Sequence, residues 1–98
     1  MDKKKVLVAE RISDKGVAKL QENPNLDVTV NFEIPREELM KIIGDYDALI
    51  VRSVTKVNEE LYDAAKNLKV VGRAGNGVDN IDIEGATKRG IIVVNTPE

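Results

Sequence analysis

The sequence of 98 residues contains no cysteine and no histidine. Without cysteine there are no disulfides and no thiolate metal sites, and without histidine the chain lacks the commonest metal ligand and the commonest general base. Aromatic residues make up only 3%. Phe32, Tyr46 and Tyr62 are scattered and accompany no basic stripe, so we interpret them as packing residues and expect no nucleic-acid surface built on base stacking.

Long apolar runs and an excess of one charge are also missing. The run Val6 to Ala9 is shorter than the apolar core of a secretory signal, and no segment approaches the roughly 18 apolar residues of a membrane span. The 15 basic and 17 acidic side chains leave a net charge of -2, which favours neither nucleic acid nor an anionic membrane as a partner. We therefore expect one compact, cytoplasmic domain.

Short apolar runs rich in β-branched residues alternate with segments of helical spacing. The runs predict five strands, over residues 6–9, 28–30, 48–51, 70–71 and 91–94. The segments between them predict four helices, over residues 14–22, 35–44, 58–67 and 82–90, with Ser13 and Asp82 as N-caps. This order predicts an α/β fold: a flavodoxin-like, five-stranded parallel sheet of order 2-1-3-4-5, with helices on both faces.

A cluster of glycines, Gly72, Gly75 and Gly77, follows the fourth predicted strand. A dinucleotide-binding loop needs G-x-G-x-x-G between the first strand and its helix. Here the third glycine of that spacing is missing, the position in the chain is wrong, and residues 10–13 after the first strand contain no glycine. We interpret the cluster as something other than a dinucleotide loop.

Arginines follow two strands that are neighbours in the predicted sheet, Arg52 after the third and Arg73 after the fourth. The carboxyl ends of adjacent parallel strands lie about 4.8 Å apart and gather ligands at one edge. Guanidinium groups beside glycine-loop amides form a receptor for a carboxylate or phosphate. The alternative is that both arginines are solvated surface cations and the glycines only permit a tight turn.

Three stretches resemble the N-terminal part of the D-2-hydroxyacid dehydrogenases: "KVLVAERIS" at 5–13, "IVRSVTKV" at 50–57 and "LKVVGRAGNGVDNIDIEGATKRGIIVVNTP" at 68–97. The resemblance implies a substrate-binding (lid) domain over residues 1–95, with residues 96–98 starting the crossing to an NAD-binding domain. It also implies a homo-oligomeric parent enzyme of serine biosynthesis that uses NAD to oxidise a small anionic hydroxy acid, 3-phosphoglycerate, to 3-phosphohydroxypyruvate.

The same resemblance implies site residues by position. Substrate binding is carried over to Arg52, Ser53, Arg73, Ala74, Gly75, Asn76 and Gly77. Asn76 also falls near the nicotinamide side of the cleft, although relatives often carry threonine or valine there. The family's catalytic arginine, glutamate and histidine and its true G-x-G-x-x-G belong to the second domain, so this chain alone is expected to be inactive.

Two readings of other classes stay open. A phosphoacceptor receiver domain shares the fold and length, but it needs an acidic pair after the first strand, an aspartate ending the third and a lysine after the fifth. The sequence has Glu10-Arg11, Arg52 and Thr96 in those places. The other reading is a stand-alone anion-binding module that acts without a catalytic domain.

Overall fold

A parallel sheet forms the centre of the computed structural model, which describes residues 3–75 and 79–96, the side chain of residue 96 excepted. The elements in chain order are β1 (Lys4–Val8), α1 (Asp14–Glu22), β2 (Leu26–Val30), α2 (Arg36–Ile42), the 3₁₀ turn η1 (Ile43–Asp45), β3 (Ala48–Val51), α3 (Glu59–Ala64), β4 (Val70–Ala74), α4 (Ile83–Lys88) and β5 (Ile92–Thr96). Within the described residues the strands lie in the order β2-β1-β3-β4-β5, and every pairing is parallel. The predicted class and strand order are confirmed.

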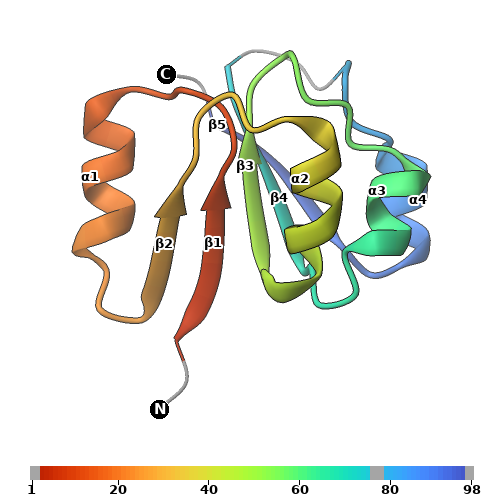
Figure 1. Ribbon diagram of the computed structural model, residues 1–98, viewed down its shortest axis with the longest axis horizontal. Coiled ribbons are helices and arrows are strands. Elements are labelled where there is room, and N and C mark those ends of the chain that lie inside the picture. Colours follow the sequence, from red (N-terminus) through yellow and green to blue (C-terminus); the bar gives the residue numbers. More distant parts are fainter. Residues whose placement is uncertain (1–2, 76–78, 97–98) are drawn as a thin grey trace.

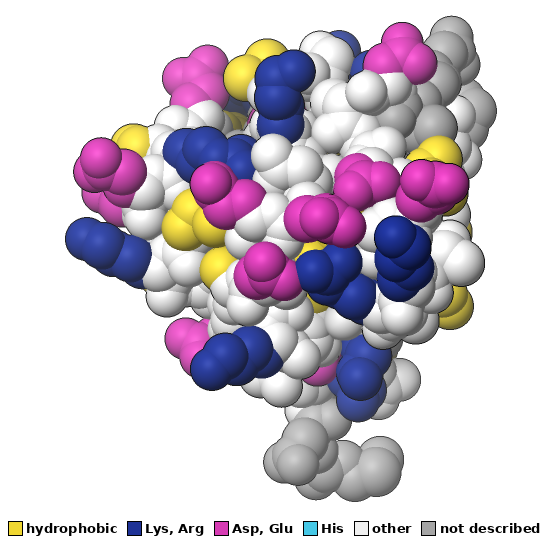
Figure 2. All heavy atoms as spheres, turned by 90° about the vertical axis from the view of Figure 1, so that its right-hand side faces the viewer, with side chains coloured by type: hydrophobic (Ala, Val, Ile, Leu, Met, Phe, Trp, Pro, Cys, Tyr) yellow, Lys and Arg dark blue, Asp and Glu magenta, His cyan; other side chains and the backbone are white. Residues whose placement is uncertain are grey.

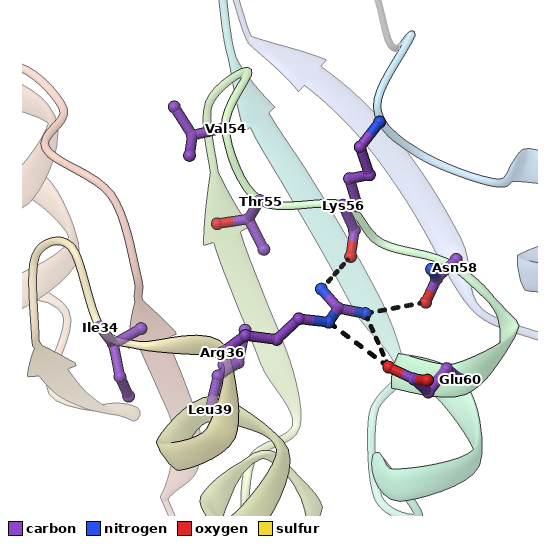
Figure 3. A pocket seen from close by; sticks show the side chains of 8 residues that line it. All are labelled: Ile34, Arg36, Leu39, Val54, Thr55, Lys56, Asn58 and Glu60. Atoms are coloured by element: carbon purple, nitrogen blue, oxygen red, sulfur yellow. Dashed lines mark hydrogen bonds and ion pairs between the residues drawn. The ribbon is translucent and has the colours of Figure 1, made fainter.

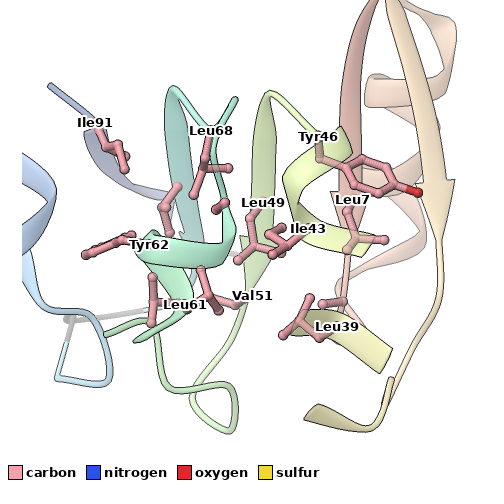
Figure 4. Close-up of a cluster of buried hydrophobic side chains, with 14 of the residues drawn as sticks. Leu7, Leu39, Ile43, Tyr46, Leu49, Val51, Leu61, Tyr62, Leu68 and Ile91 are labelled. Atoms are coloured by element: carbon pink, nitrogen blue, oxygen red, sulfur yellow. The ribbon is translucent and has the colours of Figure 1, made fainter. Parts of the chain in front are cut away.

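Helices cover both faces of the sheet, as predicted (Figure 1). On one face, Leu7 and Leu49 of the strands pack against Leu39 of α2 and Leu61 of α3, all of them 2% exposed or less. Figure 4 shows these side chains meeting between the sheet and the two helices. Because each Leu or Val buried in this way contributes about 1.5–3 kcal/mol, this layer dominates the stability of the fold.

The opposite face is covered less completely. Val17 and Leu20 of α1 pack against Val8 and its neighbours, and this helix lies beside β2 (Figure 1). At the other end of the sheet the β5 residues Ile92 and Val94 are 61% and 41% exposed. Parallel sheets normally have both faces covered, and among the described residues no helix reaches this end of the face.

Local signals in the sequence account for where the helices begin and end. The Ser13 hydroxyl accepts a hydrogen bond from the Gly16 amide at 3.1 Å, and the Asp82 carboxylate accepts one from the Gly85 amide at 3.0 Å. Both predicted N-caps are confirmed. After α4, Gly90 adopts φ +73, a left-handed conformation that costs glycine little and that commonly ends a helix.

Strand β4 is longer than predicted. The apolar run in the sequence predicts that it ends at Val71, with Gly72 and Arg73 in the following loop, but both are strand residues in register with β3 and β5. A Cβ on Gly72 would come within 2.9 Å of the Ile50 Cδ1 atom. Gly72 therefore makes room for a side chain of the neighbouring strand, and it is not part of a ligand-binding turn.

Charges on the surface are mixed in sign. The face seen in Figure 2 carries lysine and arginine side chains interspersed with aspartate and glutamate. This pattern agrees with the net charge of -2 and gives that face no broad field of one sign. No helix within residues 3–75 and 79–96 combines the length and the apolar character that crossing a bilayer requires.

Candidate anion-binding site

The carboxyl ends of β3 and β4 place the two predicted arginines at one edge of the sheet. Val51, the last residue of β3, is in register with Arg73, so Arg52 follows directly beside it. The Arg73 Nε donates a hydrogen bond to the Arg52 carbonyl oxygen at 3.3 Å. The Arg52 Nη1 donates in turn to the Arg11 carbonyl oxygen at 3.3 Å. Each arginine thus contacts the next segment along the edge, from β4 through β3 to the end of β1.

The other predicted site residues fall beside these arginines. Ser53 is exposed one residue beyond Arg52, and Ala74 ends β4 with 7% exposure. Gly75 follows with φ +127, and a Cβ built there meets nothing within 4 Å. Its backbone conformation, and not crowding, requires glycine at this turn. Asn76 and Gly77 lie outside the described residues.

A buried carboxylate lies under the loop that carries Arg52. Glu10 follows β1 and is only 7% exposed. Its carboxylate oxygens accept hydrogen bonds from the backbone amides of Arg52 at 2.8 Å, Val54 at 3.1 Å and Thr55 at 2.9 Å. We call residues 52–57, which join β3 to the N-cap of α3, the rim loop. Glu10 supplies acceptors for rim-loop donors that no strand or helix pairs.

The amides around Glu10 favour its ionised form. Burial alone would raise the pKa of this carboxyl group. The hydrogen bonds from Thr55, Arg52 and Val54 outweigh burial and hold the pKa of Glu10 below its usual value. At neutral pH the group is therefore a carboxylate that accepts from all three amides.

Asn80 holds the same loop from the other side. Its Nδ2 donates to the Arg52 carbonyl oxygen at 2.6 Å and to the Thr55 carbonyl oxygen at 2.7 Å. The segments also meet through their backbones, because the Val57 amide donates to the Asn80 carbonyl oxygen at 2.9 Å. Residues 52–57 and the segment that leads into α4 thus form one connected unit at the edge of the sheet.

Sequence reasoning missed Glu10 and Asn80 as parts of this site. In the sequence, Glu10 marks only the place where a dinucleotide loop or an acidic pair would stand, and Asn80 lies within a stretch that resembles the dehydrogenases. A usable signal was present for Glu10, since a charged residue directly after a buried parallel strand lies at the ligand-binding edge of the sheet. Asn80 carries no comparable signal.

A groove runs beside Arg52 at the ends of β1 and β3. Its lining residues come from the segments after β1, β2 and β3: Ala9, Glu10, Arg11, Glu33, Ile34, Arg52, Ser53, Val54 and Thr55. Arg11 and Arg52 bring cations to it, and Glu33 brings an exposed anion in a left-handed conformation, φ +59. The Arg11 guanidinium lies 4.7 Å from the centre of the Phe32 ring, a cation–π distance.

A second hollow adjoins this groove, and the Arg36 side chain spans it. Figure 3 shows the Arg36 guanidinium directed at the rim loop and at the start of α3. It donates to the Lys56 carbonyl oxygen at 3.0 Å, to Asn58 Oδ1 at 3.1 Å and to Glu60 Oε1 at 3.3 Å. Because these acceptors occupy the donors of Arg36, we regard this hollow as a structural junction between α2, the rim loop and α3 and not as a ligand site.

The described residues at this edge lack the acidic cluster that a metal-dependent phosphoacceptor (receiver) domain needs. Within residues 3–75 and 79–96, no group of three or more aspartate or glutamate side chains is placed to hold a metal ion. The carboxylate of Glu10, which stands where a receiver domain needs its acidic pair, accepts hydrogen bonds from the rim loop. The arrangement suits binding of an anion by guanidinium groups instead.

Comparisons with known proteins show the family and the fold of the chain. Residues 6–98 match the family model described as D-isomer specific 2-hydroxyacid dehydrogenase, catalytic domain. A D-3-phosphoglycerate dehydrogenase of Archaeoglobus fulgidus is 55% identical over 93 residues, which are 95% of this chain and 18% of that enzyme. The chain therefore spans less than a fifth of the length of that relative.

Solved structures repeat the fold. A crystal structure of a Pyrococcus horikoshii protein has a TM-score of 0.87 at 36% identity, covering 96% of this chain and 28% of that one. The NAD+-bound 3-phosphoglycerate dehydrogenase of Entamoeba histolytica has a TM-score of 0.84 at 34% identity, covering 97% of this chain and 33% of that one.

Proposed function

Because the chain belongs to the D-isomer specific 2-hydroxyacid dehydrogenase family, whose model matches residues 6–98, we propose that it is the substrate-binding part of an NAD-dependent D-3-phosphoglycerate dehydrogenase. Residues 1–95 form this domain, and residues 96–98 begin the crossing to an NAD-binding domain. The observation that carries the proposal is the edge where Arg52 and Arg73 lie next to each other beside the Gly75 turn. The relatives at 55% and 34% identity are named as 3-phosphoglycerate dehydrogenases, which supports 3-phosphoglycerate as the proposed substrate.

3-Phosphoglycerate suits this edge because it carries a carboxylate and a phosphate. Planar guanidinium groups form paired, charge-assisted hydrogen bonds with both kinds of anion. Arg52 and Arg73 neutralise and orient the acid group, and the exposed Ser53 hydroxyl supplies a further donor. The amide of Gly75 extends the cradle on the β4 side. The family resemblance adds Asn76 on the nicotinamide side, a residue outside the described part of the chain. Fixing the acid group positions the neighbouring hydroxyl carbon for reaction.

Oxidation of the substrate removes a hydride from C2 and a proton from the C2 hydroxyl, which gives 3-phosphohydroxypyruvate. In the complete enzyme, NAD would supply the acceptor for that hydride. The described residues do not fit the pyrophosphate of NAD, because residues 10–13 contain no glycine and the Ser13 side chain caps α1. With no histidine in the chain, we assign the proton acceptor, like the cofactor site, to the second domain.

The test is an NMR titration of the 98-residue chain with 3-phosphoglycerate, following the amide signals of residues 52–55 and 73–75. A binding site that is open to water should give a Kd of about 1 mM or weaker. Arg52→Ala and Arg73→Ala should each weaken binding by about tenfold, as expected for losing a charge-assisted hydrogen bond. Lys88→Ala is the matched control, because it removes an exposed cation from α4.

The outcomes separate a site from general charge attraction. If Arg52→Ala and Lys88→Ala change the Kd equally, the edge is not a specific receptor and the assignment fails. Inorganic phosphate provides the second comparison. Binding of phosphate as tight as that of 3-phosphoglycerate, with the same residues shifting, would favour a stand-alone anion-binding module over a dehydrogenase domain.

A further inference from the structure

The rim loop has almost no regular secondary structure, yet several of its backbone amides and carbonyl oxygens form hydrogen bonds with side chains from distant segments. Glu10 accepts from the amides of Arg52, Val54 and Thr55 at 2.8–3.1 Å. Asn80 donates to the carbonyl oxygens of Arg52 and Thr55 at 2.6 and 2.7 Å. Glu10 therefore accepts from three backbone amides of the loop, and Asn80 donates to two of its carbonyl oxygens.

We propose that Glu10 and Asn80 are positioning residues that hold the rim loop in the conformation from which Arg52 and Ser53 bind the substrate. This inference rests on the proposed function, because it concerns the same anion site. Neither residue contacts the substrate. They act through the loop, whose backbone they fix between the ends of β1 and β4.

The direction of the amides makes this role specific. The N–H groups of Arg52, Val54 and Thr55 point inward at the Glu10 carboxylate. An anion outside the loop therefore meets the side chains of Arg52 and Ser53 and not these amides. The arrangement also places a negative charge beneath an anion site, where electrostatic repulsion alone would weaken binding. A carboxylate at this position is explained if its effect on loop geometry outweighs that repulsion.

Asn80 also holds the rim loop in place at a cost in free energy. Its orientation is fixed, because the opposite amide orientation would set its oxygen against the carbonyl oxygens of Arg52 and Thr55. In the described part of the chain its Oδ1 is buried without a hydrogen-bond partner, which costs free energy. The two bonds to the rim loop are kept despite that cost.

The experiment compares two isosteric changes in one groove. Glu10→Gln removes a charge and leaves three amide donors facing one oxygen and an NH₂ group. Glu33→Gln removes the same charge from an exposed residue of the same groove. Repulsion alone predicts that both variants bind 3-phosphoglycerate more tightly than the original chain. The positioning role predicts that the two variants differ: Glu10→Gln should bind about tenfold more weakly, and Glu33→Gln should not bind more weakly than the original chain.

Two further measurements make the outcome decisive. Thermal unfolding checks that Glu10→Gln remains folded, and the amide signals of Arg52, Val54 and Thr55 report whether the loop has moved. Should Glu10→Gln not fold, Asn80→Ala tests the second positioning residue by the same measurements. Tighter or unchanged binding in Glu10→Gln, with those amide signals in place, overturns the inference.

Failure of the proposed function looks different. If the original chain does not bind 3-phosphoglycerate, the substrate assignment is wrong, and with it the role of Glu10 and Asn80 in substrate binding. If the original chain binds and Arg52→Ala abolishes binding while Glu10→Gln does not weaken it, the proposed function stands and only the positioning role is refuted.

Discussion

Removing the Arg36 guanidinium should destabilise the chain mainly through its hydrogen bonds to Lys56 and Asn58 and not through its ion pair. Arg36 donates to the Lys56 carbonyl oxygen at 3.0 Å and to Asn58 Oδ1 at 3.1 Å, and it pairs with Glu60 at 3.3 Å (Figure 3). The Glu60 side chain is 70% exposed, and such a pair contributes about 0–1 kcal/mol. The two hydrogen bonds from the charged donor contribute about 1 kcal/mol each, because Arg36 is itself partly exposed.

The expected sum for Arg36→Ala is a loss of about 2 kcal/mol in the free energy of unfolding, with less than about 1 kcal/mol for Glu60→Gln. Arg36→Lys should fall between them, because an ammonium group cannot reproduce the guanidinium fork. For a domain of this size, 2 kcal/mol lowers the Tm by roughly 10 °C. Urea unfolding of the 98-residue chain, followed by circular dichroism, measures all three variants.

The refuting result is equality between Arg36→Ala and Glu60→Gln. That outcome would mean that the ion pair provides the stabilisation and that the bond to Lys56 contributes nothing to the loop. A second check uses salt, since an exposed ion pair weakens as ionic strength rises. The difference in stability between the original chain and Arg36→Ala should change little between low and high salt.

Two further predictions concern packing and pH. A Cβ at Gly44 would lie 2.9 Å from the Ala64 carbonyl oxygen, whereas a Cβ at Gly72 would lie 2.9 Å from the flexible end of the Ile50 side chain. In urea unfolding, Gly44→Ala should therefore lower the free energy of unfolding by about 1–3 kcal/mol, and Gly72→Ala should lower it by less. Equal losses in the two variants would contradict this prediction. Because the folded-state pKa of Glu10 lies below its usual 4.5, its carboxylate contributes stability that is complete above about pH 4.5 and is lost as pH falls through the lowered pKa. The acid-unfolding curve of Glu10→Gln should therefore lack this component, and identical curves for both chains would rule it out.

Most of the fold follows from local signals that the sequence displays. Continuous β-branched runs, helical spacing and the caps at Ser13 and Asp82 fix the order of elements, and that order nearly determines a parallel sheet. The length of β4 does not follow, because glycine is a poor strand former by itself. Pairing on both sides, with Ile50 filling the space that Gly72 leaves, overrides that preference.

Only some of the residues that meet at the edge of the sheet could be predicted from the sequence. Strand order brings Arg52 and Arg73 together, because both follow strands that are adjacent. The roles of Glu10 and Asn80 depend on three loops converging, and the sequence separations of 42 and 28 residues from Arg52 leave no local pattern. An acidic residue after a strand resembles any solvated side chain until its burial is known.

The direction of the rim-loop amides explains why arginine side chains stand at this edge of the sheet. Glycine-rich anion sites commonly use backbone amides as donors, but the rim-loop amides of Arg52, Val54 and Thr55 are directed at Glu10. A ligand anion at β3 must therefore be met by side chains, and a guanidinium can reach past the loop and still keep a fixed plane. On the β4 side a backbone donor is available at the turn where Gly75 has φ +127. In the proposed function, the side-chain cation that follows β3 and the backbone amide of Gly75 after β4 are complementary halves of one receptor. In the proposed positioning role, Glu10 and Asn80 hold the first half in place for the second.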